Sequence, residues 1–475
     1  MPAPQREIYL LSPKQYSPET IAVAFAKTSR SPESFREIAA DLSDEQSAQF
    51  HEKWVVGYGH ASVAEHAVLH VAIENVSRVA MEAIESNRLA SYTEKSTRYQ
   101  KWNPDAFHVP AELENHPLRE EYLAVCRMLF ETYQTSLEPV RAVVERQSPR
   151  RENESEEAWD RRIRSQYVDS CRFLLPAAAL ANVGMTANGR VLENAIRKWR
   201  SHGLAEVREI GETVKAVAQG EIPTLVKYAE PVAYLVESGK ELGELANRAS
   251  VEDGRRSTRH ARMDWCTLID YDSDGERKVL AAALYRFGEM SYRQALEAVQ
   301  SIDAPTLAGA LLSRLGRFDT PLRELEHTTY TFDLVMDQGA YAEFKRHRMM
   351  TQTPQALTAA LGYVTPRRIV EAGLEDAYRR AMETAAELWQ KLAQFDPLVA
   401  QYIVPNGFNR RVLATFNLRE AYAFCQLRAA PNAHFSIRRI AQRVAEEIRR
   451  VHPALAQFMR LPAEPWQEIE KGYFA

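Results

Sequence analysis

The sequence has few cysteines, no long uninterrupted apolar run and almost no net charge. Its four cysteines, at positions 126, 171, 266 and 425, form no C-x-x-C pair, which argues against a disulfide framework or zinc knuckle and favours a reducing cytoplasm. The N-terminus shows no basic region followed by an apolar core, and the most apolar later run, from Phe173, contains a proline and is too short to span a bilayer. We therefore expect a cytoplasmic protein that makes no membrane contact.

The charge balance also limits the possible partners. Sixty basic and 64 acidic residues give a net charge of −4, so no general attraction to nucleic acid is expected and any anion binding must be local. The sequence contains no G-x-G-x-x-G, G-x-x-x-x-G-K or H-E-x-x-H pattern, so neither a Rossmann site, a P-loop nor a zinc site is indicated. With 45% hydrophobic and 26% charged residues, the chain has the composition of a soluble globular protein.

An internal repeat organises the chain. Glu65-His66 recurs as Glu326-His327, an offset of 261 residues (326 − 65), and apolar residues alternate after each pair. The alternation predicts a half-buried strand in each copy, with Leu69, Val71 and Ile73 on one face in the first and Tyr330, Phe332 and Leu334 in the second.

Two downstream segments extend the repeat. Asn188-x-Arg190 and Asn417-x-Arg419 each open a helical pattern, and asparagine is a good N-cap. Their offset is 229 residues (417 − 188), so the first copy is about thirty residues longer. We expect an α+β protein of two homologous domains, each with a small antiparallel sheet: residues 1–235 with an insertion at about 105–165, a linker at 236–262, and a more divergent copy at 263–475.

The segment "FKRHRMMTQTPQ" concentrates positive charge. Arg346 and Arg348 flank His347, and no acid follows in the segment. One guanidinium group can bind two phosphate oxygens at once through parallel hydrogen bonds, so the segment predicts an anion site. The alternative is that these arginines pair with carboxylates distant in the sequence.

Taken together, the motifs resemble those of the flavin-dependent thymidylate synthases. The first half matches that family at His60, Ser62, Glu65 and His66, then at Ser77, Arg78, Arg88, Glu94, Ser96, Arg98 and Tyr99, and further on at Arg172, Asn188, Arg190, Asn194 and Arg200. It departs at Ser86 and Asn87, where the family has the first two residues of R-H-R. The second half has the complete R-H-R, with Asn417, Arg419 and Arg428, but has Pro321, Pro354, Ala356, Thr358 and Gln401 at the other motif positions.

The resemblance implies an enzyme that methylates dUMP to dTMP, with carbon from methylene-tetrahydrofolate and hydride from FAD reduced by NADPH. By resemblance, His60 is a catalytic candidate, and the dUMP-binding residues are Glu94, Ser96, Arg98, Arg172, Arg200 and Arg428. The FAD-binding residues are Ser62, Glu65, Arg88, Asn188, Arg190, Asn194, Arg346, His347, Arg348, Asn417 and Arg419, and no metal is implied. Because family sites form between chains of a homotetramer, a duplicated chain is expected to form a homodimer that acts as a pseudo-tetramer.

Two other interpretations stay open, since each copy lacks part of the motif. One is a flavin- or nucleotide-binding relative without catalysis or with another pyrimidine substrate. The other is an oligomeric scaffold that has kept the fold and lost its ligands.

Overall fold

The computed structural model describes residues 7, 9–29, 31–57, 61–99, 102–252 and 264–475, which form two compact units. Unit 1 contains the described residues as far as Lys95, His108–His116, and the stretch from Ala179 to Glu252. Unit 2 contains Ser96–Phe107 without its two undescribed residues, Pro117–Ala178 and the described residues from 264 onward. Residues 96–107 and 117–178 of the predicted first copy therefore belong to the same compact unit as the second copy.

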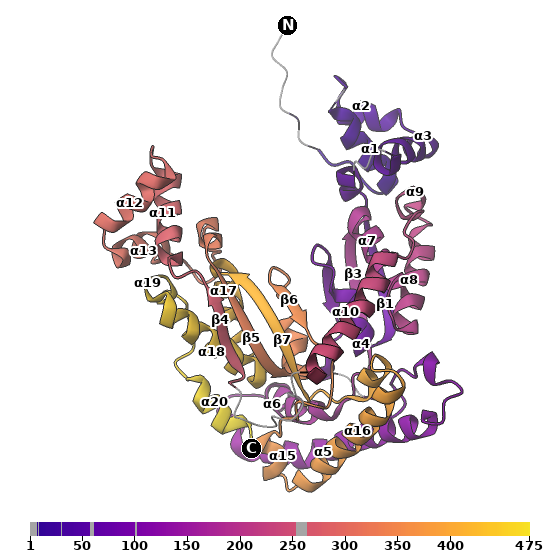
Figure 1. Cartoon of the computed structure of the whole chain (residues 1–475), viewed down its shortest axis with the longest axis vertical. Coiled ribbons are helices and arrows are strands. Elements are labelled where there is room, and N and C mark those ends of the chain that lie inside the picture. Colours follow the sequence, from indigo (N-terminus) through magenta and orange to yellow (C-terminus); the bar gives the residue numbers. More distant parts are fainter. Residues whose placement is uncertain (1–6, 8, 30, 58–60, 100–101, 253–263) are drawn as a thin grey trace. The chain divides into compact units, whose positions relative to one another are not determined.

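Unit 1 is built on a three-stranded antiparallel sheet in the order β1-β3-β2 (Val68–Ser77, Leu180–Asn188, Ser91–Glu94). Helices α4 (Arg78–Glu85), α7 (Gly189–Arg200) and α8 (Ala205–Ala218) pack on this sheet or on one another (Figure 1). The remaining helices of unit 1 are α1 (Pro18–Thr28), α2 (Phe35–Ala40), α3 (Asp44–Phe50), η1 (His51–Gly57), η2 (Ala61–His66), η4 (Ala111–Leu113), α9 (Pro223–Val226) and α10 (Ala233–Glu252).

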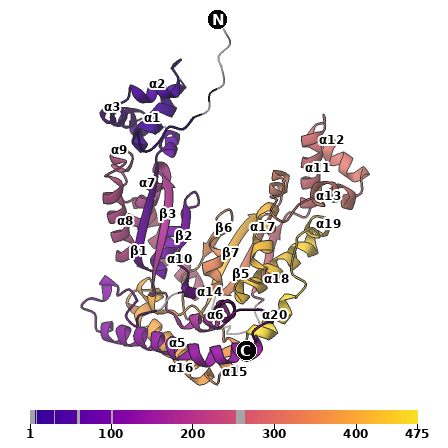
Figure 2. The same ribbon diagram turned by 180° about the vertical axis from the view of Figure 1, so that it is seen from behind.

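Unit 2 is built on a four-stranded antiparallel sheet in the order β4-β5-β7-β6 (Cys266–Tyr271, Thr329–Asp337, Asn409–Asn417, Thr351–Pro354). The predicted face of the strand in the second copy is confirmed, since Tyr330, Phe332 and Leu334 are fully buried. Helices α14 (Gln338–Phe344), α17 (Leu418–Arg428) and α18 (Phe435–Val451) pack on the sheet (Figure 2).

Unit 2 contains further helices. They are η3 (Thr97–Tyr99), α5 (Arg119–Gln147), α6 (Glu156–Cys171), η5 (Arg172–Leu174), α11 (Gly275–Phe287), α12 (Tyr292–Ser301), α13 (Ala304–Leu312), η7 (Arg323–His327), α15 (Arg367–Glu371), α16 (Glu375–Phe395), η8 (Val399–Ile403), α19 (Pro453–Ala456) and α20 (Trp466–Tyr473). The predicted α+β class, with a small antiparallel sheet in each part, is confirmed. No described helix is long and apolar enough to cross a membrane.

The two copies of the repeat fold in the same register. In unit 1, Ser91 of β2 pairs with Thr186 of β3; in unit 2, Thr351 of β6 pairs with Thr415 of β7. The offsets are 260 (351 − 91), which is also the offset between Arg88 and Arg348, and 229 (415 − 186), which is the offset between Asn188 and Asn417. The predicted N-caps are also confirmed: the Asn188 side chain accepts from Val191 N at the start of α7, and Asn417 accepts from Glu420 N at the start of α17.

A β-bulge explains why the offset changes from 261 to 260 within the first strand. Val68 pairs with Asn188 and Thr329 with Asn417, but the register of β1 shifts between Ile73 and Val76. Inside this shift Asn75 adopts a φ of 57°, and its N–H donates to the Asn182 side chain at 3.0 Å. One extra residue in the first copy therefore leaves both ends of the strand paired as in the second.

Segments of the first copy are joined to the second copy by backbone hydrogen bonds within unit 2. Gly407 N donates to Phe173 O at 2.9 Å, and the Asn406 amide donates to Arg172 O at 3.2 Å. A β-carbon on Gly407 would lie 2.7 Å from Tyr378 Oη and 2.6 Å from Met382 Cε, so a larger residue here would require both side chains to shift. These contacts fix the backbone position from which the Arg172 side chain extends.

Candidate functional site

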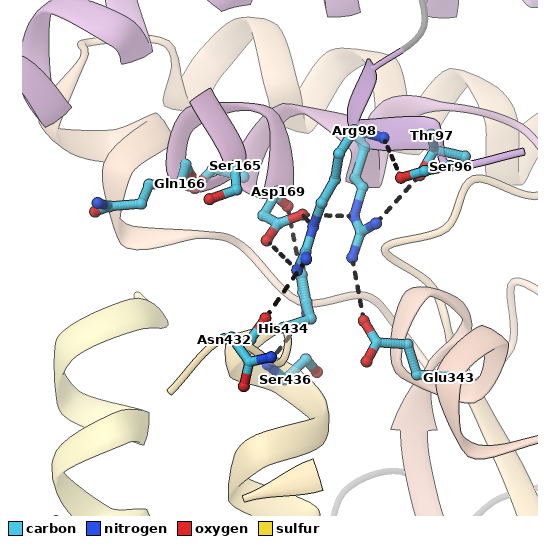
Figure 3. Close-up of polar contacts among 12 residues, drawn as sticks. Ser96, Thr97, Arg98, Ser165, Gln166, Asp169, Glu343, Asn432, His434 and Ser436 are labelled. Atoms are coloured by element: carbon cyan, nitrogen blue, oxygen red, sulfur yellow. Dashed lines mark hydrogen bonds and ion pairs between the residues drawn. The ribbon is translucent and has the colours of Figure 1, made fainter. Parts of the chain in front are cut away.

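A cluster of charged side chains in unit 2 combines residues from both copies of the repeat. The first copy contributes η3 and the junction of α6 with η5, while the second contributes α14, α17 and the segment before α18. Figure 3 shows Arg98, Asp169 and Glu343 converging from these elements. Because all of them belong to unit 2, the cluster lies within one compact body.

Asp169 holds the two arginines that come from the first copy. Arg98 donates from Nε to Oδ1 at 2.9 Å and from Nη2 to Oδ2 at 2.7 Å. Arg172 Nε lies 3.2 Å from Oδ1 of the same carboxylate, and Arg172 Nη1 donates to Thr97 Oγ1 at 3.1 Å. Paired bonds of this kind are strong and directional, so both guanidinium groups are fixed in position.

Glu343 lies between an arginine of each copy. Its Oε2 accepts from Arg428 Nη1 at 2.9 Å, and its Oε1 lies 3.7 Å from Arg172 Nη2. This Nη2 is buried and has no hydrogen-bond partner among the described residues. Arg172 therefore has one N–H group in the cluster whose hydrogen bonding is unsatisfied.

His347, the centre of R-H-R, is buried with both ring nitrogens engaged. Arg428 Nε donates to His347 Nε2 at 3.0 Å, so Nε2 is the acceptor and Nδ1 carries the proton that is donated to Glu420 Oε1 at 2.9 Å. Burial lowers the pKa of His347 despite the opposing effect of the Glu420 hydrogen bond, so the ring is neutral near pH 7. Arg346 is exposed and Arg348 half-buried on either side of it.

His434, the residue before α18, contacts the cluster at Asp169. It is fully buried, its ring stacks on Phe435 at a centroid distance of 4.2 Å, and it contacts Phe173 at 5.4 Å. Its Nδ1 accepts from Ser436 N at 3.2 Å, so Nε2 donates to Asp169 O at 3.2 Å. Burial lowers the pKa of His434, with Arg172 acting in the same direction.

The cluster is electrically balanced while its carboxylates are ionised. Burial alone would raise the pKa of Asp169 and of Glu343, but nearby cations, Arg172 foremost, outweigh burial and lower both values. Three arginines (Arg98, Arg172 and Arg428) then face three carboxylates (Asp169, Glu343 and Glu420), with His347 neutral.

The first copy has no such residues at the equivalent positions. Offsets of 260 and 229 place Ala83, Asn87, Val191 and Trp199 where the second copy has Glu343, His347, Glu420 and Arg428. In unit 1 the Trp199 indole donates to Ala83 O at 3.0 Å, and Lys198 donates to the Asn87 side chain at 3.0 Å. Conversely, the second copy has Leu398 and Gln401 in place of Asp169 and Arg172. The charged cluster therefore forms only when Arg98, Asp169 and Arg172 of the first copy meet Glu343, His347, Glu420 and Arg428 of the second; the reverse pairing lacks these residues.

The other predicted site residues of the first copy lie in unit 1. Glu94 forms a short ion pair with Arg78, and its side chain is 2% exposed. Arg190 donates to Glu65 at 2.5 Å, and Arg200 donates to Glu212 at 2.7 Å and to Glu230 at 2.8 Å. Asn188 caps α7, Ser62, Arg88 and Asn194 are exposed, and His60 lies outside the described residues.

Unit 2 also contains a cavity of about 630 Å³ at the predicted flavin residue Arg419. Arg419 donates to Glu326 at 2.8 Å and to Pro321 O at 2.9 Å, and Arg286 on another wall pairs with Glu324. The volume is in the range of small-molecule sites. Among the described residues, no group of three His, Cys, Asp or Glu side chains is arranged to hold a metal ion.

Several residues of the cluster are absent from the sequence-based prediction. Asp169 and Arg172 are three apart on a helix, a spacing that predicts an ion pair, so Asp169 could have been found. Glu343, Glu420 and His434 give no such local signal. They join the cluster through contacts between segments that are far apart in the chain.

Comparison with known proteins identifies relatives that match most of this chain and relatives that match about half of it. The family model Thy1, described as thymidylate synthase complementing protein, matches residues 11–224 and 267–454. A UPF0159 protein of Chlamydia muridarum is 33% identical over 439 residues, 88% of this chain and 82% of its own length. One of Thermoplasma acidophilum is 30% identical over 460 residues, 88% and 89% of the two chains. A flavin-dependent thymidylate synthase of Clostridium tetani is 28% identical over 223 residues, 45% of this chain and 83% of its own.

Proposed function

The chain belongs to the Thy1 family, and on that premise we propose that it is a flavin-dependent thymidylate synthase that methylates dUMP to dTMP. Methylene-tetrahydrofolate supplies the carbon, and FAD reduced by NADPH supplies the hydride. The observation that carries the proposal is the convergence, in unit 2, of Arg98 and Arg172 from one copy with His347 and Arg428 from the other.

The nucleotide phosphate is assigned to Ser96, Arg98 and Arg172, with Arg428 beside them. Guanidinium groups that carboxylates already hold in place lose little conformational freedom when an anion binds. The buried, unsatisfied Nη2 of Arg172 fits this role, because it is a charged donor in need of an acceptor. Glu94 and Arg200, which lie in unit 1, are assigned to dUMP by the family resemblance alone.

The flavin is assigned to the R-H-R segment and to Asn417 and Arg419. In the first copy it is assigned to Arg88, Asn188 and Arg190, the equivalents of Arg348, Asn417 and Arg419, and also to Ser62, Glu65 and Asn194. The cavity beside Arg419 has the volume of a small-molecule site, and the arginines that line it pair with Glu324 and Glu326 of the same lining. FAD supplies hydride chemistry when bound; the chain's residues bind and orient the ligands.

A protein thiolate plays no part in this proposal. Burial raises the pKa of Cys126, Cys171, Cys266 and Cys425, so each is a neutral thiol near pH 7. Ser96 is exposed and its Oγ accepts from Arg98 N at 3.3 Å, so we assign it to ligand binding and not to nucleophilic attack.

Two measurements test the proposal. The purified protein should show flavin absorbance, and with methylene-tetrahydrofolate and NADPH it should release tritium from 5-labelled dUMP. Flavin content without tritium release would contradict the synthase and favour the second candidate.

That second candidate is a flavin- and nucleotide-binding relative without synthase activity. It is favoured by the balance of three arginines against three carboxylates, because such a cluster is stable without a ligand. For both candidates we propose a cytoplasmic homodimer in which each chain contributes two family domains.

A further inference from the structure

The carboxylate of Glu343 lies beside Arg172 and Arg428, where an anionic ligand of these two arginines would bind. Its two carboxylate oxygens face two different guanidinium groups, Arg428 at 2.9 Å and Arg172 at 3.7 Å. The Glu343 side chain is 16% exposed, so water screens these contacts only weakly. The carboxylate therefore spans two arginines that were assigned to the nucleotide.

The fold of the repeat does not require an acid at this position. The equivalent residue on the corresponding helix of the first copy is Ala83, whose neighbour across the site is Trp199 instead of an arginine. The acid is thus found in the copy where the position faces arginines. Without it, the cluster would carry one net positive charge.

The fit between Glu343 and Arg172 is incomplete. Arg428 Nη1 donates a hydrogen bond of normal length to Glu343 Oε2, whereas Arg172 Nη2 lies beyond hydrogen-bonding distance of Oε1 and has no other partner among the described residues. A planar carboxylate offers two acceptor oxygens, whereas a phosphate offers three around a tetrahedral centre, and can satisfy donors that converge from more directions.

We infer that Glu343 is a built-in anion that competes with the nucleotide phosphate for Arg172 and Arg428 and so limits the affinity of the site for phosphorylated ligands. The inference rests on the proposed nucleotide site. It assigns to Glu343 a role in specificity: while its carboxylate stays in place, it disfavours a second anion on the same two arginines and leaves contacts to the base and sugar unaffected.

The test compares Glu343→Gln with the wild-type chain, using dUMP and deoxyuridine as ligands in titration calorimetry. The glutamine keeps the shape and one acceptor oxygen but removes the charge, so dUMP should bind roughly tenfold tighter or better. Deoxyuridine lacks the phosphate, so its affinity should not change. A dUMP affinity that is equal or lower in the variant would overturn the inference.

A matched control separates a local effect from a change in total charge. Glu154→Gln removes one negative charge from unit 2 at a side chain that is 12% exposed and pairs with Arg162 at 2.8 Å, outside the cluster. This variant should bind dUMP as the wild type does; an equal gain in both variants would overturn the inference. If Glu343→Gln does not fold, Glu343→Ala, which copies the first-copy residue, takes its place with the same expected gain.

The outcome differs from that of the synthase assay. Tighter binding of dUMP by the variant, together with no tritium release by the wild type, would support the inference and reject the synthase. Tritium release by the wild type, together with no gain in the dUMP affinity of the variant, would support the synthase and reject the inference. Absence of dUMP binding to both proteins would overturn the inference and the nucleotide site together.

Discussion

Arg98 and Asp169 form an ion pair of two hydrogen bonds, at 2.9 and 2.7 Å, and the same carboxylate lies 3.2 Å from Arg172. The Asp169 side chain is 9% exposed. Replacing it with asparagine leaves two guanidinium groups partly buried without their counter-ion, which should lower the free energy of unfolding by roughly 2–4 kcal/mol. Urea unfolding followed by tryptophan fluorescence measures the change.

The control for this variant is Asp105→Asn. Asp105 accepts from Arg127 at 2.8 Å, but both side chains are more than half exposed, so water already solvates the charges. Its loss should change the free energy of unfolding by less than about 0.5 kcal/mol. Equal effects of the two substitutions would show that the Asp169 pair is an ordinary surface contact.

The second prediction concerns the role of Arg98 in ligand binding. Arg98→Ala should weaken dUMP binding by about one to two powers of ten, because one charge-assisted contact to the phosphate is lost. FAD affinity should hardly change, since its proposed contacts are on other residues. Arg127→Ala, which removes an exposed arginine of unit 2, is the control, and unaltered dUMP affinity in Arg98→Ala would reject the assignment.

Much of the fold could be predicted because it depends on local patterns. The alternation at Tyr330, Phe332 and Leu334 predicts a buried strand face, and Asn188 and Asn417 predict helix starts; the structure confirms both. The compact units could not be predicted in this way. Residues 117–178 belong to unit 2 because of tertiary contacts, such as the hydrogen bond from Gly407 to Phe173, that no local pattern encodes.

The candidate site could be predicted only in part, for the same reason. A family resemblance finds arginines such as Arg98, Arg172 and Arg428, because motifs record residue type and spacing. It does not find their counter-ions: Glu343 is 171 residues from Arg172 (343 − 172) and Glu420 is 73 residues from His347. The burial that lowers the pKa of His347 likewise depends on the packed structure.

The third prediction is a stoichiometry of one dUMP per chain. The reverse pairing of the copies would combine Ala83, Asn87 and Trp199 with Ala356, Thr358 and Gln401, none of which is charged. These positions offer a phosphate no guanidinium group to replace its lost water, and the neighbouring Arg200 already pairs with Glu212 and Glu230. Titration calorimetry should give a single class of sites with at most one dUMP per chain, and two equivalent sites would contradict this prediction.

The fourth prediction concerns R-H-R. Replacing Arg346 and Arg348 together with alanine should release FAD, because each removes a charge-assisted contact worth roughly 1.5–3 kcal/mol. Arg379→Ala on α16, an exposed arginine paired with Asp376, is the control. The measurement is the flavin absorbance that stays with the purified protein, and full occupancy in the double variant would reject the assignment.

The last prediction is that the protein loses stability steadily as the pH falls below about 6.5. Burial is the foremost cause that lowers the pKa values of His51, His202, His347, His434 and His452, so the folded chain binds fewer protons than the unfolded chain, whose histidines titrate near 6.5. The pKa values of Asp169 and Glu343 are also lowered, because nearby cations outweigh burial, so their contribution is present above the ordinary carboxylate range of about 4 and is lost below it. Both sets have the same sign: the free energy of unfolding falls as the pH falls, by up to about 1.4 kcal/mol per pH unit for each proton that the unfolded chain binds in excess.

Urea unfolding at pH 7.5, 6.0 and 5.0 measures the slope of the free energy of unfolding against pH. His434→Gln removes one of these groups, so it should lower stability at pH 7.5 but give a shallower decline toward pH 5.0. A slope of zero, or one as steep in His434→Gln as in the wild type, would show that burial of the neutral imidazole at this position does not determine the acid sensitivity.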